Sequence, residues 1–266
     1  MQDIIDSYRY PIDQLEHPKA QEILAYCHQQ LTDYGVVSLP GLLHKDCITR
    51  ILAEATPLFV DQAFTHQRSH NVFFLPEVPG LAPEHPALMT FETTNHTLVA
   101  KQLPDSPLTR LYEWEALRDF LALVMQKPKL YMMDDPLARM NVMAYHHDEA
   151  LNWHFDRSEF TITLLLQAPL QGGEFEYRIG LRDGTYTDYD AVGRFLQCPD
   201  KVNQVPLEAG TLTIFKGQNT LHRVAPVVGE RARIVATLSY YENPGVRFSD
   251  AENKGFYGQT NALVTN

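Results

Sequence analysis

Cysteine is scarce in this 266-residue chain, and its three cysteines, Cys27, Cys47 and Cys198, lie far apart. They form neither the closely spaced pairs of a thiolate metal site nor the framework of a disulfide-rich domain. The first residues also lack the basic and apolar regions of a secretory signal peptide. We therefore expect reduced thiols and a cytoplasmic location.

Two further absences narrow the class of partner. No apolar run approaches the length of a membrane-spanning helix, and Lys and Arg do not cluster, while the formal net charge is −11. Such a chain repels a phosphate backbone, so neither a nucleic acid nor a membrane is expected as a partner. A small cationic or zwitterionic substrate suits this charge better, and the sequence is compatible with a homodimer.

Helical patterns dominate the first half of the chain. Apolar residues at helical spacing predict helices over residues 23–31 and 48–55, and we expect Pro57 to kink or end the second. A capping serine, followed by proline at the first helical position, begins a third predicted helix over residues 106–127. These helices are expected to support a sheet by packing against it.

Residues 62–105, between the second and third predicted helices, are expected to be irregular because they contain five prolines. Phe73, Phe74 and Phe91 argue against a solvated linker, which seldom carries aromatic side chains. A long loop inside a compact domain is usually functional. We therefore expect this lobe to cover a substrate.

Short β-rich runs separated by turn residues follow from about residue 129, a pattern typical of a sandwich or barrel. No repeat or domain break is found, so one domain over residues 1–266 is expected. It would comprise helical support and lobe (1–128), a β core (129–245) and a C-terminal tail (246–266). The predicted strands cover residues 36–41, 140–145, 160–167, 173–177, 211–215 and 231–241.

The segment Trp153-His154-Phe155-Asp156 carries a candidate metal site. Residues two apart in a strand face the same side, so His154 and Asp156 can reach one ion. Two imidazoles and a carboxylate can hold one face of Fe(II), and His222 is the candidate for the second imidazole. A His-x-Asp triplet also arises by chance, and the run His146–Glu149 is a rival cluster that we expect in a solvated turn.

Arg233 lies in a strand pattern whose residues Ile234, Ala236 and Leu238 form an apolar face. Arg233 therefore points to the opposite face, which it shares with Thr237 and Ser239. A buried guanidinium without an anion is costly, so either an anionic ligand or a carboxylate of the chain itself should accompany it. Thr237 and Ser239 are candidates for hydrogen bonds to a substrate.

Three segments together resemble the motifs of Fe(II)/2-oxoglutarate-dependent oxygenases of the prolyl-4-hydroxylase-like type. The Trp-His-Phe-Asp form further resembles the branch that contains carrier-independent amino-acid halogenases and related hydroxylases. The resemblance covers about residues 138–241, in the order found in that superfamily. The segments are Tyr145–Arg157, the Gly-Gly-Glu run Gln171–Glu176, and Glu208–Phe215 followed by Leu221–Val224 and Arg233.

This resemblance implies a mainly β fold, a double-stranded β-helix (jelly roll, cupin-like) packed against the N-terminal helices. It implies that His154, Asp156 and His222 bind Fe(II) and that Arg233 holds the distal carboxylate of 2-oxoglutarate. Tyr145 is a further candidate for the co-substrate pocket. With O2, these cofactors oxidise an unactivated C–H bond and release succinate and CO2.

The fate of the substrate depends on one residue. Halogenases of this branch carry Gly or Ala in place of the carboxylate ligand, whereas this chain carries Asp156. Hydroxylation of a small molecule is therefore expected, with a free amino acid as the first candidate. A hydroxylase acting on a protein residue and a non-catalytic metal-binding jelly roll are the alternatives. Further candidate substrate contacts are Arg157, Asn71 and Tyr257.

Overall fold

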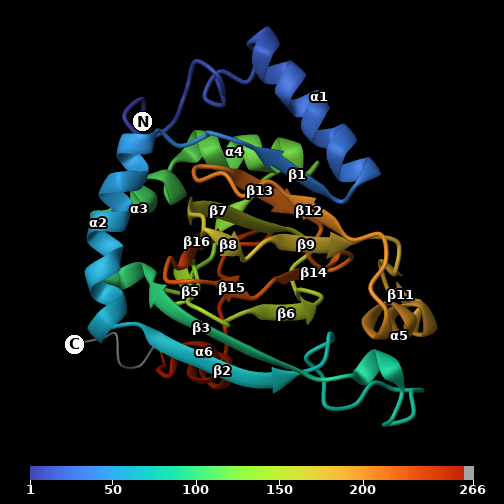
Figure 1. The fold of residues 1–266 in the computed structure, drawn as a ribbon. Coiled ribbons are helices and arrows are strands. Elements are labelled where there is room, and N and C mark those ends of the chain that lie inside the picture. Colours follow the sequence, from blue (N-terminus) through green and yellow to red (C-terminus); the bar gives the residue numbers. More distant parts are fainter. Residues whose placement is uncertain (261–266) are drawn as a thin grey trace.

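Two facing antiparallel sheets form the centre of the molecule in the computed structural model, which describes residues 1–260 (Figure 1). The aromatic rings of Phe175 and Phe215, one from each sheet, lie 4.9 Å apart between the layers. The larger sheet has the order β1 (Val36–Leu39), β13 (Leu212–Phe215), β7 (Thr161–Gln167), β16 (Arg233–Leu238), β5 (Met140–Tyr145), β3 (Phe91–Val99) and β2 (Phe64–His70). The smaller sheet has the order β12 (Asn203–Val205), β9 (Phe175–Arg178), β14 (Leu221–Val224) and β6 (Leu151–His154).

Helices cover the outer face of the larger sheet because that face is apolar. Ile234, Ala236 and Leu238 of β16 are buried in the main core together with apolar residues of the helices. Each such side chain contributes roughly 1.5–3 kcal/mol when it is fully buried. The covering helices are α1 (Pro18–Asp33), α2 (Lys45–Asp61), α3 (Pro107–Tyr112) and α4 (Glu115–Val124) (Figure 1).

The remaining elements are short and lie around the two sheets. Helix α5 packs against η1, and helix α6 contacts β2. The helices are η1 (Pro86–Leu88), η2 (Ala100–Gln102), α5 (Tyr189–Gln197) and α6 (Asp250–Tyr257). The paired short strands are β10 (Arg182–Asp183) with β11 (Tyr186–Thr187), β15 (Val227–Val228) with β8 (Gln171–Gly172), and β17 (Tyr240–Tyr241) with β4 (Tyr131–Met132).

The expected strands of the second half are confirmed with small shifts at their ends, and the longest, 231–241, is divided into β16 and β17. The expected irregular lobe is wrong in part. Residues 64–70 and 91–99 form β2 and β3, which pair at the edge of the larger sheet, so the loop is confined to residues 71–90 and its flanks. β2 escapes a hydrophobic-pattern search because its inward positions carry His and Arg.

Two helix predictions also need correction. Helix α2 continues past Pro57 to Asp61, and the third predicted helix is two helices. Trp114 has an extended backbone (φ −72°, ψ 121°), which separates α3 from α4. The boundary drawn at residue 128 does not separate helical support from a β core, because β1, β2 and β3 all precede it. In the tail, α6 is helical, and residues 261–266 lie outside the described residues.

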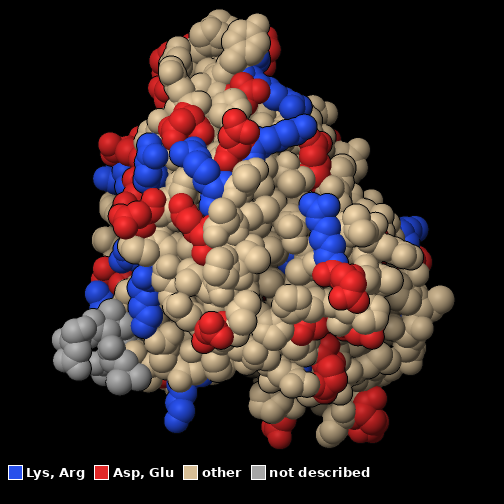
Figure 2. Space-filling view, turned by 60° about the vertical axis from the view of Figure 1, so that its left-hand side comes forward, with Lys and Arg blue, Asp and Glu red and all other residues tan. Residues whose placement is uncertain are grey.

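Two surface properties complete the description. None of the helices described over residues 1–260 combines the length and the apolar character needed to cross a bilayer. On the face drawn in Figure 2, basic and acidic side chains are interspersed, and the basic ones form no broad patch.

Candidate metal centre

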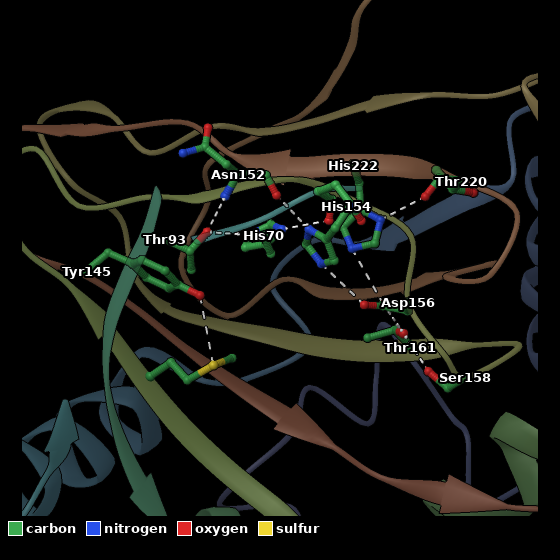
Figure 3. Close-up of polar contacts among 12 residues, drawn as sticks. His70, Thr93, Tyr145, Asn152, His154, Asp156, Ser158, Thr161, Thr220 and His222 are labelled. Carbon is green, nitrogen blue, oxygen red and sulfur yellow. Dashed lines mark hydrogen bonds and ion pairs between the residues drawn. The ribbon is translucent and has the colours of Figure 1, made fainter. Parts of the chain in front are cut away.

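His154 and His222 occupy directly paired positions on the neighbouring strands β6 and β14. Their rings therefore lie side by side, with centroids 4.2 Å apart, and both side chains are buried. Asp156 lies beyond the end of β6, and its backbone N–H donates to the carbonyl of Gly217 (3.0 Å). One ligand atom from each of these three residues lies within 4.8 Å of the other two (Figure 3).

Backbone carbonyls orient both imidazoles. Nδ1 of His154 lies 2.7 Å from the carbonyl of Asn152, and Nδ1 of His222 lies 2.8 Å from that of Thr220. A carbonyl can only accept, so each Nδ1 carries the hydrogen and each Nε2 presents a lone pair. The two Nε2 atoms lie 3.3 and 3.5 Å from the oxygens of Asp156, around one common point.

A hydrogen-bond chain continues behind His154 (Figure 3). The N–H of Asn152 donates to the hydroxyl of Thr93 (3.1 Å), which lies 2.7 Å from Nε2 of His70. Nδ1 of His70 faces the carbonyl of Asn71 at 2.9 Å and must donate to it. Nε2 of His70 therefore accepts from the hydroxyl of Thr93, and every donor and acceptor along the chain has a fixed role.

The electrostatics of the site favour the unprotonated forms of Asp156 and His222 near neutral pH. Burial alone would raise the pKa of Asp156, but His222, His154 and the hydroxyl of Thr161 hold it below its ordinary value. The Thr161 hydroxyl donates to Asp156 over 2.5 Å. Burial lowers the pKa of His222 to about 4, so this ring is neutral at pH 7. A carboxylate with a neutral imidazole is the state that binds a metal.

Gly217 makes room for the carboxylate. A Cβ atom at this position would lie 2.6 Å from the Thr161 hydroxyl oxygen and 2.7 Å from Oδ2 of Asp156. Both distances are far below van der Waals contact. The glycine before the β14 strand therefore lets the Gly217 turn pack directly on Asp156 and hold it beside the two histidines.

Arg233 is buried at the start of β16, and among the described residues its Nε and Nη1 have no hydrogen-bond partner. No described carboxylate forms an ion pair with it, and burial lowers its pKa to about 10. Its guanidinium lies 5.9 Å from the ring centre of buried Tyr145, whose pKa burial raises to about 12. Arg233 also lines a cavity of about 20 Å³ with Thr211, whose buried hydroxyl is likewise unpartnered.

The packing near Arg233 gives a structural reason for the two glycines of the Gly-Gly-Glu run. Gly172 and Gly173 both have positive φ, and a Cβ on Gly172 would lie 2.2 Å from the carbonyl oxygen of Pro226. A Cβ on Gly173 would lie 3.3 Å from Cδ of Arg233. Gly172 thus allows this segment to pack against the backbone of Pro226, and Gly173 allows it to pack against the stem of the arginine.

These residues fit Fe(II) and 2-oxoglutarate. Two imidazoles and a carboxylate converge as one face of an octahedral ion requires, and no described cysteine lies among them. The unpartnered guanidinium of Arg233 has the chemistry that binds a carboxylate in two-point fashion. Both halves of the expected constellation are therefore present, on separate sheets that face each other.

A cavity of about 260 Å³ lies beside the metal site. Of the expected substrate contacts, Arg157, Ser239 and Tyr257 line it, but each side chain already has a partner: Arg157 pairs with Glu252, Ser239 donates to the carbonyl of Ala138 (3.0 Å), and Tyr257 donates to Asn141 (2.9 Å).

Two other expected contacts do not reach this cavity. The side chain of Asn71 bonds to the backbone of Phe73 and Leu75 and so shapes its own loop. Thr237 lies on the inward face of β16 but does not line the cavity. Asn71 instead lines a cleft of about 1060 Å³ under residues 71–90.

The rival cluster is only partly a turn. His146 is exposed, as expected, but Glu149 accepts from its backbone N–H (2.7 Å) and pairs with Nε2 of His96 at 2.8 Å. His96, His146 and Glu149 form a second group of ligand atoms within 4.8 Å of one another. It is away from the 260 Å³ cavity, which none of these residues lines.

Several cavity residues were missed at the level of sequence, most of them on β2, β3 and α6. Alternation of polar residues in Phe64–His70 is the pattern that could have located those on β2. The missed residues are His66, Arg68, Asn95, Thr97, Asn141 on β5, and Phe256.

Several solved structures share this fold. AviO1 from Streptomyces viridochromogenes Tue57 has a TM-score of 0.55 at 16% identity, over 85% of this chain and 97% of that one. A 2OG-Fe(II) oxygenase-family oxidoreductase from Burkholderia pseudomallei has a TM-score of 0.51 at 16% identity, over 84% and 92%. The epimerase SnoN, in a complex with Fe3+, alpha ketoglutarate and nogalamycin RO, has 0.52 at 16%, over 83% and 84%.

These likenesses confirm the expected fold. A search of functionally curated proteins finds no match. A family model described as Halogenase D matches residues 19–251, which is most of the chain. The chain therefore belongs to the Halogenase D family, within the superfamily of Fe(II)- and 2-oxoglutarate-dependent oxygenases that its motifs resemble.

Proposed function

We propose that this protein is an Fe(II)- and 2-oxoglutarate-dependent hydroxylase of a small molecule, with a free amino acid as the first candidate substrate. The carboxylate of Asp156, held against His154 and His222 by Gly217 and Thr161, carries the proposal. Iron bound there, with 2-oxoglutarate and O2, supplies the oxidant for an unactivated C–H bond.

The roles of the chain's own residues follow from their geometry. His154, Asp156 and His222 would hold the iron from one side and leave the other side open. Arg233 would bind the distal carboxylate of 2-oxoglutarate, with Tyr145 packed beside it. The 260 Å³ cavity orients the substrate next to the metal, and helix α6 helps to exclude water from it.

Asp156 favours hydroxylation over halogenation within this family. A halide needs the position on the metal that the carboxylate fills, and this carboxylate already points at the common point between the histidines. The compact cavity favours a small molecule over a residue within a protein. With three cysteines and no framework for disulfides, we place this activity in the cytoplasm.

The test has two stages. Anaerobic addition of Fe(II) and 2-oxoglutarate should give the weak visible charge-transfer band of the chelate; its absence would contradict the oxygenase. Succinate formation is then screened across free amino acids, and the product should gain 16 mass units. The Asp156→Gly variant should lose hydroxylation by at least about a hundredfold, since one metal ligand is gone. A chlorinated product from the unmodified protein in chloride buffer would contradict the hydroxylase.

A further inference from the structure

Arg68 is a further cation to consider beside Arg233, and it lines the 260 Å³ cavity, whereas Arg233 lines the cavity of about 20 Å³. It projects from the inward face of β2, and its Nε is buried without a hydrogen-bond partner among the described residues. Salt bridges are found for Arg157 and Arg223 but none for Arg68. Burial lowers the pKa of Arg68 to about 10, so its charge persists at pH 7 without a counter-ion.

Two aromatic rings frame this guanidinium. Its central carbon lies 4.1 Å from the ring centre of Phe74 and 5.3 Å from that of Phe256. Phe74 belongs to the loop after β2, and Phe256 belongs to α6, so segments far apart in sequence meet at Arg68. The rings hold its plane in place but provide no acceptor for its N–H groups.

Arg68 lines at least three cavities, one of them a cavity of about 440 Å³ that Glu252 also lines. It lines the 260 Å³ cavity beside His154 and Asp156, and it also lines a cleft of about 1060 Å³ under residues 71–90. Phe74 also lines both this cavity and this cleft. A molecule that enters through the cleft would pass this cation before it reached the metal.

The rest of the metal-side cavity is uncharged or already neutralised. Among the described residues that line it, Asp156 is the one acidic group, and it faces the metal site. The cation of Arg157 is paired with Glu252. Burial lowers the pKa of His66 to about 4, so this ring is neutral at pH 7. The other polar lining groups are His154, Asn95, Thr97, Asn141, Ser158, Thr161, Ser239, Tyr241 and Tyr257.

We propose that Arg68 binds a carboxylate of the substrate, between the rings of Phe74 and Phe256, while the neutral amides and hydroxyls that line the cavity contact the rest of the substrate. This inference rests on the proposed function, and it names the substrate class as a carboxylate-bearing molecule with an uncharged tail. The overall charge of −11 favours a cationic substrate, but the cavity opposes a cationic tail because no free carboxylate lines it.

The test compares matched probes by calorimetry on protein loaded with Mn(II) and N-oxalylglycine, an unreactive analogue of 2-oxoglutarate. L-norleucine should bind at least about tenfold more tightly than L-norleucinamide, which lacks the carboxylate, and than L-lysine, which adds a cation at the tail. Arg68→Gln should weaken norleucine binding at least about tenfold and abolish its advantage over the amide. Arg68→Lys should fall between, because it keeps the charge and loses the planar fork.

Arg50→Gln is the matched control, because Arg50 is paired with Asp3 and lines none of the cavities that Arg68 lines, and it should change norleucine binding less than about threefold. Equal binding of the acid and the amide, unaltered binding by Arg68→Gln, or no norleucine binding at all would overturn the inference. Mn(II) uptake is followed separately by electron paramagnetic resonance. Protein that takes up no Mn(II) contradicts the proposed function instead, and the norleucine comparison, made on unloaded protein, still decides the role of Arg68.

Discussion

The orientation of His154 depends on residues that never touch the metal site. The ring Nδ1–H of His154 donates to the carbonyl of Asn152. The backbone N–H of Asn152 donates to the hydroxyl of Thr93, which in turn donates to Nε2 of His70. Both His70 and Thr93 are buried, so water cannot replace a lost partner. The position of the His154 ring therefore depends on this chain of hydrogen bonds.

Replacement of Thr93 by Val removes the hydroxyl at the centre of the chain and nearly preserves its volume. We expect Thr93→Val to weaken Mn(II) binding by about 3- to 10-fold, because partners behind a ligand contribute to its affinity. Thr94→Val is the matched control, since the neighbouring side chain of β3 points to the other face of the sheet. Calorimetry measures both variants; equal affinities would show that the chain does not position His154.

At the scale of elements, the turn between β13 and β14 determines where Asp156, just beyond the end of β6, can lie. Gly217 of that turn approaches Asp156 so closely that a Cβ would lie 2.9 Å from the Cβ of Asp156. We expect Gly217→Ala to displace the carboxylate and to weaken Mn(II) binding at least about tenfold. In an Asp156→Gly background the contacts with Asp156 are removed while the 2.6 Å contact with the Thr161 hydroxyl remains, so the same substitution should cost less than in the unmodified protein.

This cycle of variants separates the clash from a general loss of stability. Gly255→Ala is the control, because a Cβ there has no neighbour within 4 Å. A Gly217→Ala penalty that is equal in both backgrounds would contradict the contact with Asp156. Thermal unfolding of each variant shows whether the fold is retained.

Sequence patterns were informative where one periodicity applied to a whole element. Met140–Tyr145 was predicted to the residue, because β5 is buried between its neighbours and rich in apolar residues. The three candidate metal residues were chosen partly by strand spacing, and the structure brings them together, but Asp156 reaches the group from a loop beyond β6 and not from the strand itself. β2 was missed, and with it Arg68, because a strand facing a polar cavity shows no apolar alternation.

For the whole molecule, three buried neutral histidines link folding to pH. Burial lowers the pKa values of His66, His70 and His222 to about 4 each, from an ordinary value near 6.5. Below about pH 6.5 the unfolded chain takes up protons that the folded chain does not. The free energy of unfolding of the metal-free protein should therefore fall as the pH decreases from about 6.5 to about 4.

Urea unfolding at pH 7, 6 and 5 measures this dependence, and the uptake of more than one proton on unfolding is expected near pH 5. His17 is solvent-exposed, so His17→Asn should leave the slope unchanged, whereas His66→Asn should reduce it. A pH-independent free energy of unfolding over this interval would contradict the neutral state of the buried rings.

Because His154 and His222 are opposite each other in a backbone ladder, the spacing between the two imidazoles is set by strand pairing and needs no ion to establish it. The carboxylate of Asp156, in contrast, comes from a loop beyond the end of β6. Asp156 can therefore be substituted or lost during evolution without a change in the spacing of His154 and His222. This modular arrangement gives a physical reason why one family could accommodate different oxidative outcomes on a single scaffold.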